Sequence, residues 1–126
     1  MDKPSTKYFK TILLVAMVYV AIQFFHKFQR QKYLEIAEKT LTVLAIEEEF
    51  YFSRHFNYTA NLTDLDIEIP GSLSIDISAT SDGWTGVAKH KHLSSENGCV
   101  IYFGTSEIPS LGETKPRFAG DVACTP

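Results

Sequence analysis

The first quarter of the chain is apolar, and the pattern that follows is periodic. Residues 8–28 are largely apolar and contain no turn signal. The strictly uncharged part, 11–25, has fifteen residues, or about 22 Å of helix, against the roughly 30 Å hydrocarbon core of a bilayer. The side chains of Lys10, His26 and Lys27 can reach the interface, and Tyr8, Phe9 and Phe28 extend the apolar surface to about 31 Å. We therefore expect one transmembrane helix at residues 8–28, preceded by a cytoplasmic tail at residues 1–7.

A cleaved signal peptide is the alternative interpretation of this stretch. Lys3, Lys7 and Lys10 resemble the basic region of such a peptide. However, no small-x-small cleavage site ends the apolar run, because Ala21 is followed by Ile-Gln-Phe-Phe. The pattern favours a membrane anchor that is retained.

Beyond residue 28 the apolar positions recur at intervals of three and four, which predicts that the helix continues to about His55. The stripe on its predicted inner face comprises Leu34, Ala37, Leu41, Leu44, Glu48, Tyr51 and His55. We expect Ile36, Val43 and Phe50 to widen this face enough to cover a sheet. Glu47, Glu48 and Glu49 point about 100° apart and cannot converge on one ion, so they predict a solvated acidic turn. Glu48 is the exception, because it lies on the stripe and needs a partner or a route to water.

The remaining pattern predicts a small antiparallel sheet. Residues 57–65 are rich in turn formers, and residues 73–79 alternate strictly between apolar and polar. Turn signals at 81–83 and at Asn97-Gly98 separate this strand from predicted strands at 84–92 and 99–103, and a short strand is expected at 122–124. The predicted fold class is therefore α+β: a long N-terminal helix packed on three to four antiparallel strands. Residues 29–126 form the extramembrane domain in this interpretation.

Two cysteines, Cys99 and Cys124, lie near the end of the chain outside any CxxC spacing. We expect them to form a disulfide, which would contribute roughly 3.5 kcal/mol in the chain-entropy model; two buried thiols are the alternative. Charge does not orient the helix, because lysines precede the span and His26, Lys27 and Arg30 follow it. Since disulfides persist in oxidising compartments, we expect the domain on the periplasmic side of a bacterial inner membrane and the N-terminus in the cytoplasm.

Charge and motif content exclude several classes of function. The net charge is −3, and part of the 12 Lys+Arg flanks the span, so the remaining chain is acidic and nucleic acid is not an expected partner. His90 and His92 form the one close histidine pair in the sequence, but Lys91 between them adds repulsion, which favours a surface pair over a metal site. The sequence contains no phosphate-binding glycine loop, nucleophile elbow or HExxH helix. We therefore expect no catalytic residues, no metal and no cofactor.

The order of these features resembles the type IV pilins and pseudopilins. The helix end at 41–55 carries aromatic residues and a His, and is followed by Tyr58 and the turn at 62–65. Residues 83–90, 99–104 and 120–124 are similar to the last strands and the cysteine-closed loop of a pilin head. The resemblance covers nearly the whole chain after the first dozen residues and implies a helix with a small sheet-containing head.

The chain departs from that family at its N-terminus. A prepilin has a glycine before the cleavage site and a glutamate a few residues into the apolar helix. Here Tyr8-Phe9 stand near the expected glycine, Leu13 stands where the glutamate belongs, and the first glycine is Gly71. The resemblance therefore implies a pilin-like subunit that is not cut by the prepilin peptidase and does not polymerise.

These observations lead to a non-catalytic structural subunit as the expected function. Its partners would be the lipid bilayer and other subunits of an inner-membrane complex of photosynthetic, respiratory or secretion type. The alternatives are a minor pilin or pseudopilin, and an anchored periplasmic binding module with contacts at Trp84, His90 and His92. Gln23 would seek a hydrogen bond from a neighbouring helix, or would simply lie near the interface. The expected membrane or partner contacts are Tyr8, Phe9, Tyr19, Gln23, Phe24, Phe25 and Phe28.

Overall fold

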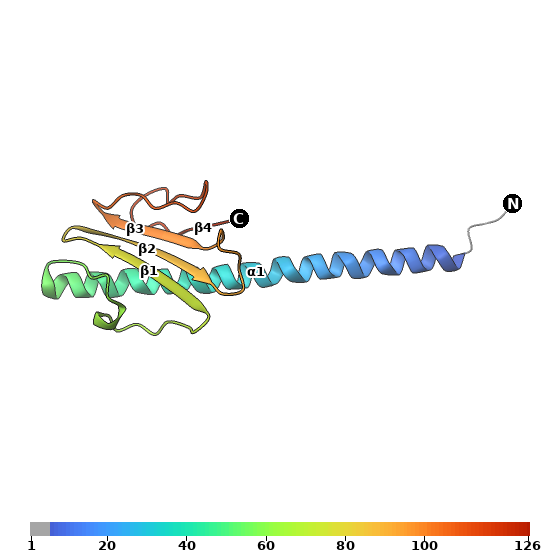
Figure 1. The fold of residues 1–126 in the computed structure, drawn as a ribbon, viewed down its shortest axis with the longest axis horizontal. Helices are drawn as coiled ribbons and strands as arrows, with labels where there is room; N and C mark the ends of the chain where they lie inside the picture. Colours follow the sequence, from blue (N-terminus) through green and yellow to red (C-terminus); the bar gives the residue numbers. More distant parts are fainter. Residues whose placement is uncertain (1–5) are drawn as a thin grey trace. The chain divides into compact units, whose positions relative to one another are not determined.

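The computed structural model describes residues 6–126, which form one long helix followed by a small sheet (Figure 1). The elements are α1 (Thr6–His55), the short 3-10 helix η1 (Leu62–Asp64), β1 (Leu73–Ala79), β2 (Gly83–His90), β3 (Cys99–Gly104) and β4 (Ala123–Cys124). The α+β fold predicted from the sequence is confirmed. Of the predicted tail at 1–7, residues 1–5 lie outside the described residues, and Thr6 and Lys7 belong to the first turn of α1.

Helix α1 is long because nothing in its sequence interrupts it. Residues 6–55 contain neither Gly nor Pro. Thr11, Thr40 and Thr42 each donate their hydroxyl to the carbonyl four residues earlier, at 2.8–2.9 Å, so these β-branched residues are accommodated in helical geometry. The helix ends where Phe56 adopts a left-handed conformation (φ 57°) and its N–H donates to the carbonyl of Phe52 at 2.8 Å.

The chain divides into two units, the first ending at Lys32 and the second comprising Tyr33–Pro126. In the first unit, every described residue from Thr6 to Phe28 is exposed. In the second unit, the sheet lies along the second half of α1 (Figure 1). The helix supplies one wall of the core and the sheet supplies the other.

The four strands form an antiparallel meander in the order β1-β2-β3-β4. Strand β2 is central: Ala88 lies opposite Ile75 on β1 and opposite Cys99 on β3. The predicted second strand at 84–92 was too long, because β2 ends at His90 and Lys91 lies in a turn. The N–H of Lys91 still donates to the carbonyl of Ser72 at 2.9 Å, so this turn remains tied to the start of β1.

The core lies between the predicted helical stripe and the inner face of the sheet. Ala37, Leu41 and Leu44 are fully buried, as are Trp84 on β2 and Cys99 on β3. The stripe prediction is confirmed for Leu34 through Glu48, whereas the predicted flank was partly wrong. Val43 (45% exposed) and Phe50 (55% exposed) point away from the sheet, because the helix presents only a narrow face to it.

Close approach of α1 to the sheet depends on a glycine in β2. A Cβ atom at Gly86 would lie 3.1 Å from the ring of Trp84, 3.3 Å from the side chain of Ile101 and 3.4 Å from that of Leu41. Because Gly86 has no side chain, the indole of Trp84 can pack close to the backbone of β2.

Candidate functional site

The predicted membrane-contact residues lie on a fully exposed apolar helix. Tyr8 (72%), Phe9 (64%) and Tyr19 (63%) are exposed near its beginning and middle. Phe24, Phe25 and Phe28 are 57–72% exposed, and Gln23 is exposed as well. Spacing of four residues places Tyr19 and Gln23 on one face and Phe24 and Phe28 on another, so the predicted contacts do not converge on a single spot.

By length and composition, α1 is the one helix among the described residues that is long and apolar enough to cross a membrane. No part of its most apolar window is buried by the rest of the described chain. Burial of an apolar side chain gains about 1.5–3 kcal/mol, so an exposed apolar helix of this length is typical of one that lipid or another protein covers.

A second exposed apolar stripe lies on the part of α1 that belongs to the second unit, and sequence reasoning missed it. Val43, Ile46 and Phe50 follow each other at intervals of three and four and are 45%, 52% and 55% exposed. Val43 and Phe50 were predicted to lie against the sheet, but they are exposed. An apolar side chain on a helix can lie in the core of its own domain or contact a partner. Which of the two applies to Val43 and Phe50 depends on how wide a face of the helix the sheet covers. Contiguous exposed apolar residues of this kind are typical of an interaction surface.

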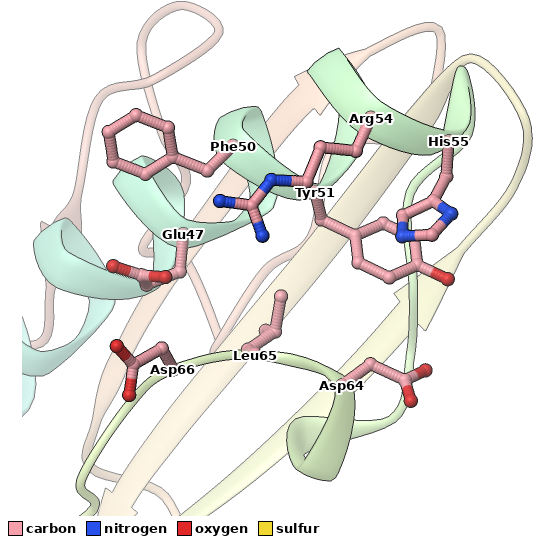
Figure 2. A pocket seen from close by; sticks show the side chains of 8 residues that line it. All are labelled: Glu47, Phe50, Tyr51, Arg54, His55, Asp64, Leu65 and Asp66. Carbon is pink, nitrogen blue, oxygen red and sulfur yellow. The ribbon is translucent and has the colours of Figure 1, made fainter.

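An open pocket of about 330 Å³ lies between the last turns of α1 and the loop after η1 (Figure 2). Leu65 points up into this pocket, whereas Asp64 and Asp66 lie on opposite sides of it. On the helix side, the rings of Tyr51 and His55 are 4.2 Å apart. The remaining lining residues are Glu47, Phe50 and Arg54. The ion pairs Lys39–Glu35 and Arg117–Asp121 lie outside this pocket, and its wall carries both signs of charge.

Glu48 is the most unusual titratable group near this pocket. Its side chain is fully buried, and Oε2 accepts a hydrogen bond from the N–H of Thr59 at 3.1 Å. Oε1 has no hydrogen-bond partner among the described residues. Burial is the main cause that raises the pKa of Glu48 to about 7, with a smaller contribution from the nearby carboxylates of Glu49 and Asp64. The partner that the sequence required is therefore a backbone N–H in the loop after the helix.

Thr59 joins this carboxyl to the rest of the loop. Its hydroxyl donates to Asp64 at 2.8 Å and accepts from the N–H of Asn61 at 3.1 Å. Glu48, Thr59 and Asp64 thus hold residues 59–64 against the end of α1. The arrangement is a structural clamp.

The histidine pair is not the exposed surface pair that the sequence predicted. His90 is only 4% exposed and its ring stacks on Tyr33 at 4.1 Å. The N–H of His92 donates to Nδ1 of His90 at 3.1 Å, and the two imidazole rings are 5.3 Å apart. Trp84 is fully buried as well, so of the predicted binding-module contacts only His92 is exposed. No group of three potential metal ligands occurs among residues 6–126.

The predicted disulfide is present between Cys99 on β3 and Cys124 on β4. Their Cα atoms are 4.1 Å apart, and the two residues are direct neighbours in the β3–β4 register. Strand β4 has only two residues, so the covalent bond holds a segment that two backbone pairs alone would hold weakly.

The sequence matches no protein-family model and no curated protein.

Proposed function

We propose that this protein is a single-span, non-catalytic structural subunit of a larger inner-membrane complex, with a pilin-like periplasmic domain that stabilises or caps the complex. The observation that carries the proposal is the uncovered apolar surface of α1. Lipid alone can cover residues 8–28, but it does not explain the second stripe at Val43, Ile46 and Phe50, which follows the span by fifteen residues or more. A protein partner would cover part of the apolar helix at residues 8–28 and also the stripe at Val43, Ile46 and Phe50.

The disulfide supports a periplasmic location for the domain, because such bonds persist in oxidising compartments. Gln23, an exposed amide within the apolar run, supports helix–helix contact in the membrane. Protein interfaces have an apolar core with a polar rim. The charged residues around the pocket of Figure 2, next to the exposed Phe50, fit the rim of such an interface.

Co-purification tests this proposal. The membranes are extracted with a mild detergent, and the chain is purified through a C-terminal tag. Native electrophoresis is then expected to show the chain together with other membrane subunits. The double variant Ile46→Gln/Phe50→Gln should lose these partners, whereas Ile108→Gln/Phe118→Gln, at positions of similar exposure (55% and 59%), should retain them. Near-ultraviolet circular dichroism of the buried Trp84 checks that each variant is folded. Migration of the wild-type chain alone would refute the proposal.

A minor pilin or pseudopilin is the second candidate. It is favoured by the helix-plus-meander arrangement with a cysteine-closed C-terminal segment. Intact mass measurement of the chain from its native host distinguishes the two, because a pilin is shortened by the prepilin peptidase and the proposed subunit is not. Recovery of the chain in sheared filaments would favour this second candidate.

A further inference from the structure

A cationic, hydroxyl-rich pocket lies at the edge of the sheet, where β2 ends and β1 begins. It has a volume of about 310 Å³ and is lined by two lysines and four serines, in addition to His90. These are Lys89, Lys91, Ser72, Ser74, Ser94 and Ser95. No carboxylate stands among the described residues that line it.

The backbone fixes these groups in place. Ser74 lies opposite Lys89 in the β1–β2 register, and the N–H of Lys91 donates to the carbonyl of Ser72 at 2.9 Å. The stem of Lys89 packs against Gly98, where an added Cβ would lie 3.2 Å from its Cγ. Ser94 accepts a hydrogen bond from the side chain of Asn97 at 2.6 Å, which leaves its hydroxyl proton available to a ligand. The backbone that carries these side chains is therefore held by the sheet and by the turn that follows β2.

The positive charge of the pocket is not neutralised within the described chain. The ion pairs Lys39–Glu35 and Arg117–Asp121 lie elsewhere, and no ion pair found among the described residues involves Lys89 or Lys91. Burial is the main cause that lowers the pKa of His90, and the neighbouring His92 and Lys91 lower it further. An anion with several acceptor oxygens suits such a site.

The position along the chain identifies the source of the anion. His90 stacks on Tyr33, which follows Phe28, the last residue of the proposed span, by five residues. Five helical residues rise about 8 Å, and the headgroup layer on one side of a bilayer is roughly 5–8 Å thick. Along helix α1, Tyr33 therefore follows the end of the proposed span by about the thickness of one headgroup layer, which makes lipid phosphates the expected source of the anion.

We propose that the pocket formed by Lys89, Lys91 and the four serines binds the phosphate of an anionic membrane lipid. Each lysine supplies a charge-assisted hydrogen bond to a phosphate oxygen, and the serine hydroxyls donate to the remaining oxygens. This inference rests on the membrane anchoring in the proposed function, but not on the partner subunits.

Native mass spectrometry of the full chain, released from detergent micelles containing equal amounts of phosphatidylglycerol and phosphatidylcholine, tests the proposal. The wild-type chain is expected to retain phosphatidylglycerol in preference, and Lys89→Gln/Lys91→Gln should reduce that preference on the order of tenfold. The charge-matched control Lys39→Gln/Lys115→Gln changes two exposed lysines outside the pocket and should retain the preference. An unchanged preference in Lys89→Gln/Lys91→Gln, or an equal loss in the control, would overturn the proposal.

Amide chemical shifts of the same samples distinguish lipid from free phosphate. Phosphatidylglycerol should shift signals at residues 72–74 and 89–95, and inorganic phosphate should do so only weakly. Saturation by inorganic phosphate without any response to the lipid would overturn the lipid assignment. Because the purified chain is used alone, a failure here is separate from a failure to find partner subunits.

Discussion

The carboxyl group of Glu48 makes the stability of the second unit, Tyr33–Pro126, depend on pH. Its pKa is about 7 in the folded chain, above the ordinary 4.5, mainly because burial disfavours the charged form. Between these two values the folded chain binds more protons than the unfolded chain, so the free energy of unfolding falls as the pH rises from about 4.5 to about 7. The loss is complete only well above pH 7, where the carboxylate is charged in both states.

We predict that Glu48→Gln removes this pH dependence. The amide keeps an acceptor for the N–H of Thr59 and carries no charge, so the variant should be more stable than the wild type at pH 8 by about 1–3 kcal/mol. Urea unfolding of the full chain in detergent at several pH values, followed by the fluorescence of Trp84, measures the effect. Glu38→Gln, an exposed position on the same helix, should leave the pH profile unchanged. A Glu48→Gln profile parallel to that of the wild type would contradict the prediction.

A second prediction concerns Gly86, where the helix and the sheet approach each other. Gly86→Ala places a methyl group 3.1 Å from the indole of Trp84 and 3.3 Å from Ile101, which overpacks the core. We expect a loss of about 1–3 kcal/mol in the free energy of unfolding. Gly71→Ala is the matched control, because a Cβ at Gly71 meets no atom within 4 Å. Equal stability of the two variants by thermal unfolding would show that the contact at Gly86 is not tight.

At the scale of elements, the end of α1 contains a strained residue. Phe56 is the one non-glycine residue with positive φ among residues 6–126, and its side chain is 79% exposed. The left-handed conformation costs an L-residue about 1–2 kcal/mol, which glycine does not pay. We predict that Phe56→Gly is more stable than Phe56→Ala by about 1 kcal/mol in chemical denaturation. Phe56→Ala being the more stable of the two would mean that the ring, or another conformation, decides the end of the helix.

The hydrophobic pattern along the sequence predicts the helix and strands of this protein well, but it predicts poorly which segments pack against them. The strict alternation at 73–79 gives β1 with its observed bounds, and the helical stripe gives the buried residues from Leu34 to Glu48. The period of a helix does not reveal how wide a face its partner covers, which is why Val43 and Phe50 were assigned to the core.

The same limit applies to the candidate sites. The predicted second strand extended to residue 92, but the chain turns at Lys91, and His90 is buried against Tyr33, a residue 57 positions earlier in the chain. The partner of Glu48 is a backbone N–H, and the pocket around Lys89 and Lys91 combines two strands and a loop. Contacts of this kind are set by the pairing of distant segments, which residue types along one segment do not encode.

At the scale of the whole molecule, the division into an exposed apolar unit and a packed unit predicts how the protein partitions between membrane and water. An arginine near the centre of a membrane helix costs about 2.5–3.5 kcal/mol on insertion scales. Val15 and Val18 lie near the middle of the proposed span, so Val15→Arg/Val18→Arg should release the chain into the supernatant after an alkaline wash, whereas the wild type stays in the membrane pellet. Val43→Arg/Ile46→Arg introduces the same charges at exposed positions of the same helix outside the span and should stay in the pellet. If the wild type is found in the supernatant, or if the two double variants partition alike, the span at residues 8–28 does not hold this protein in a membrane.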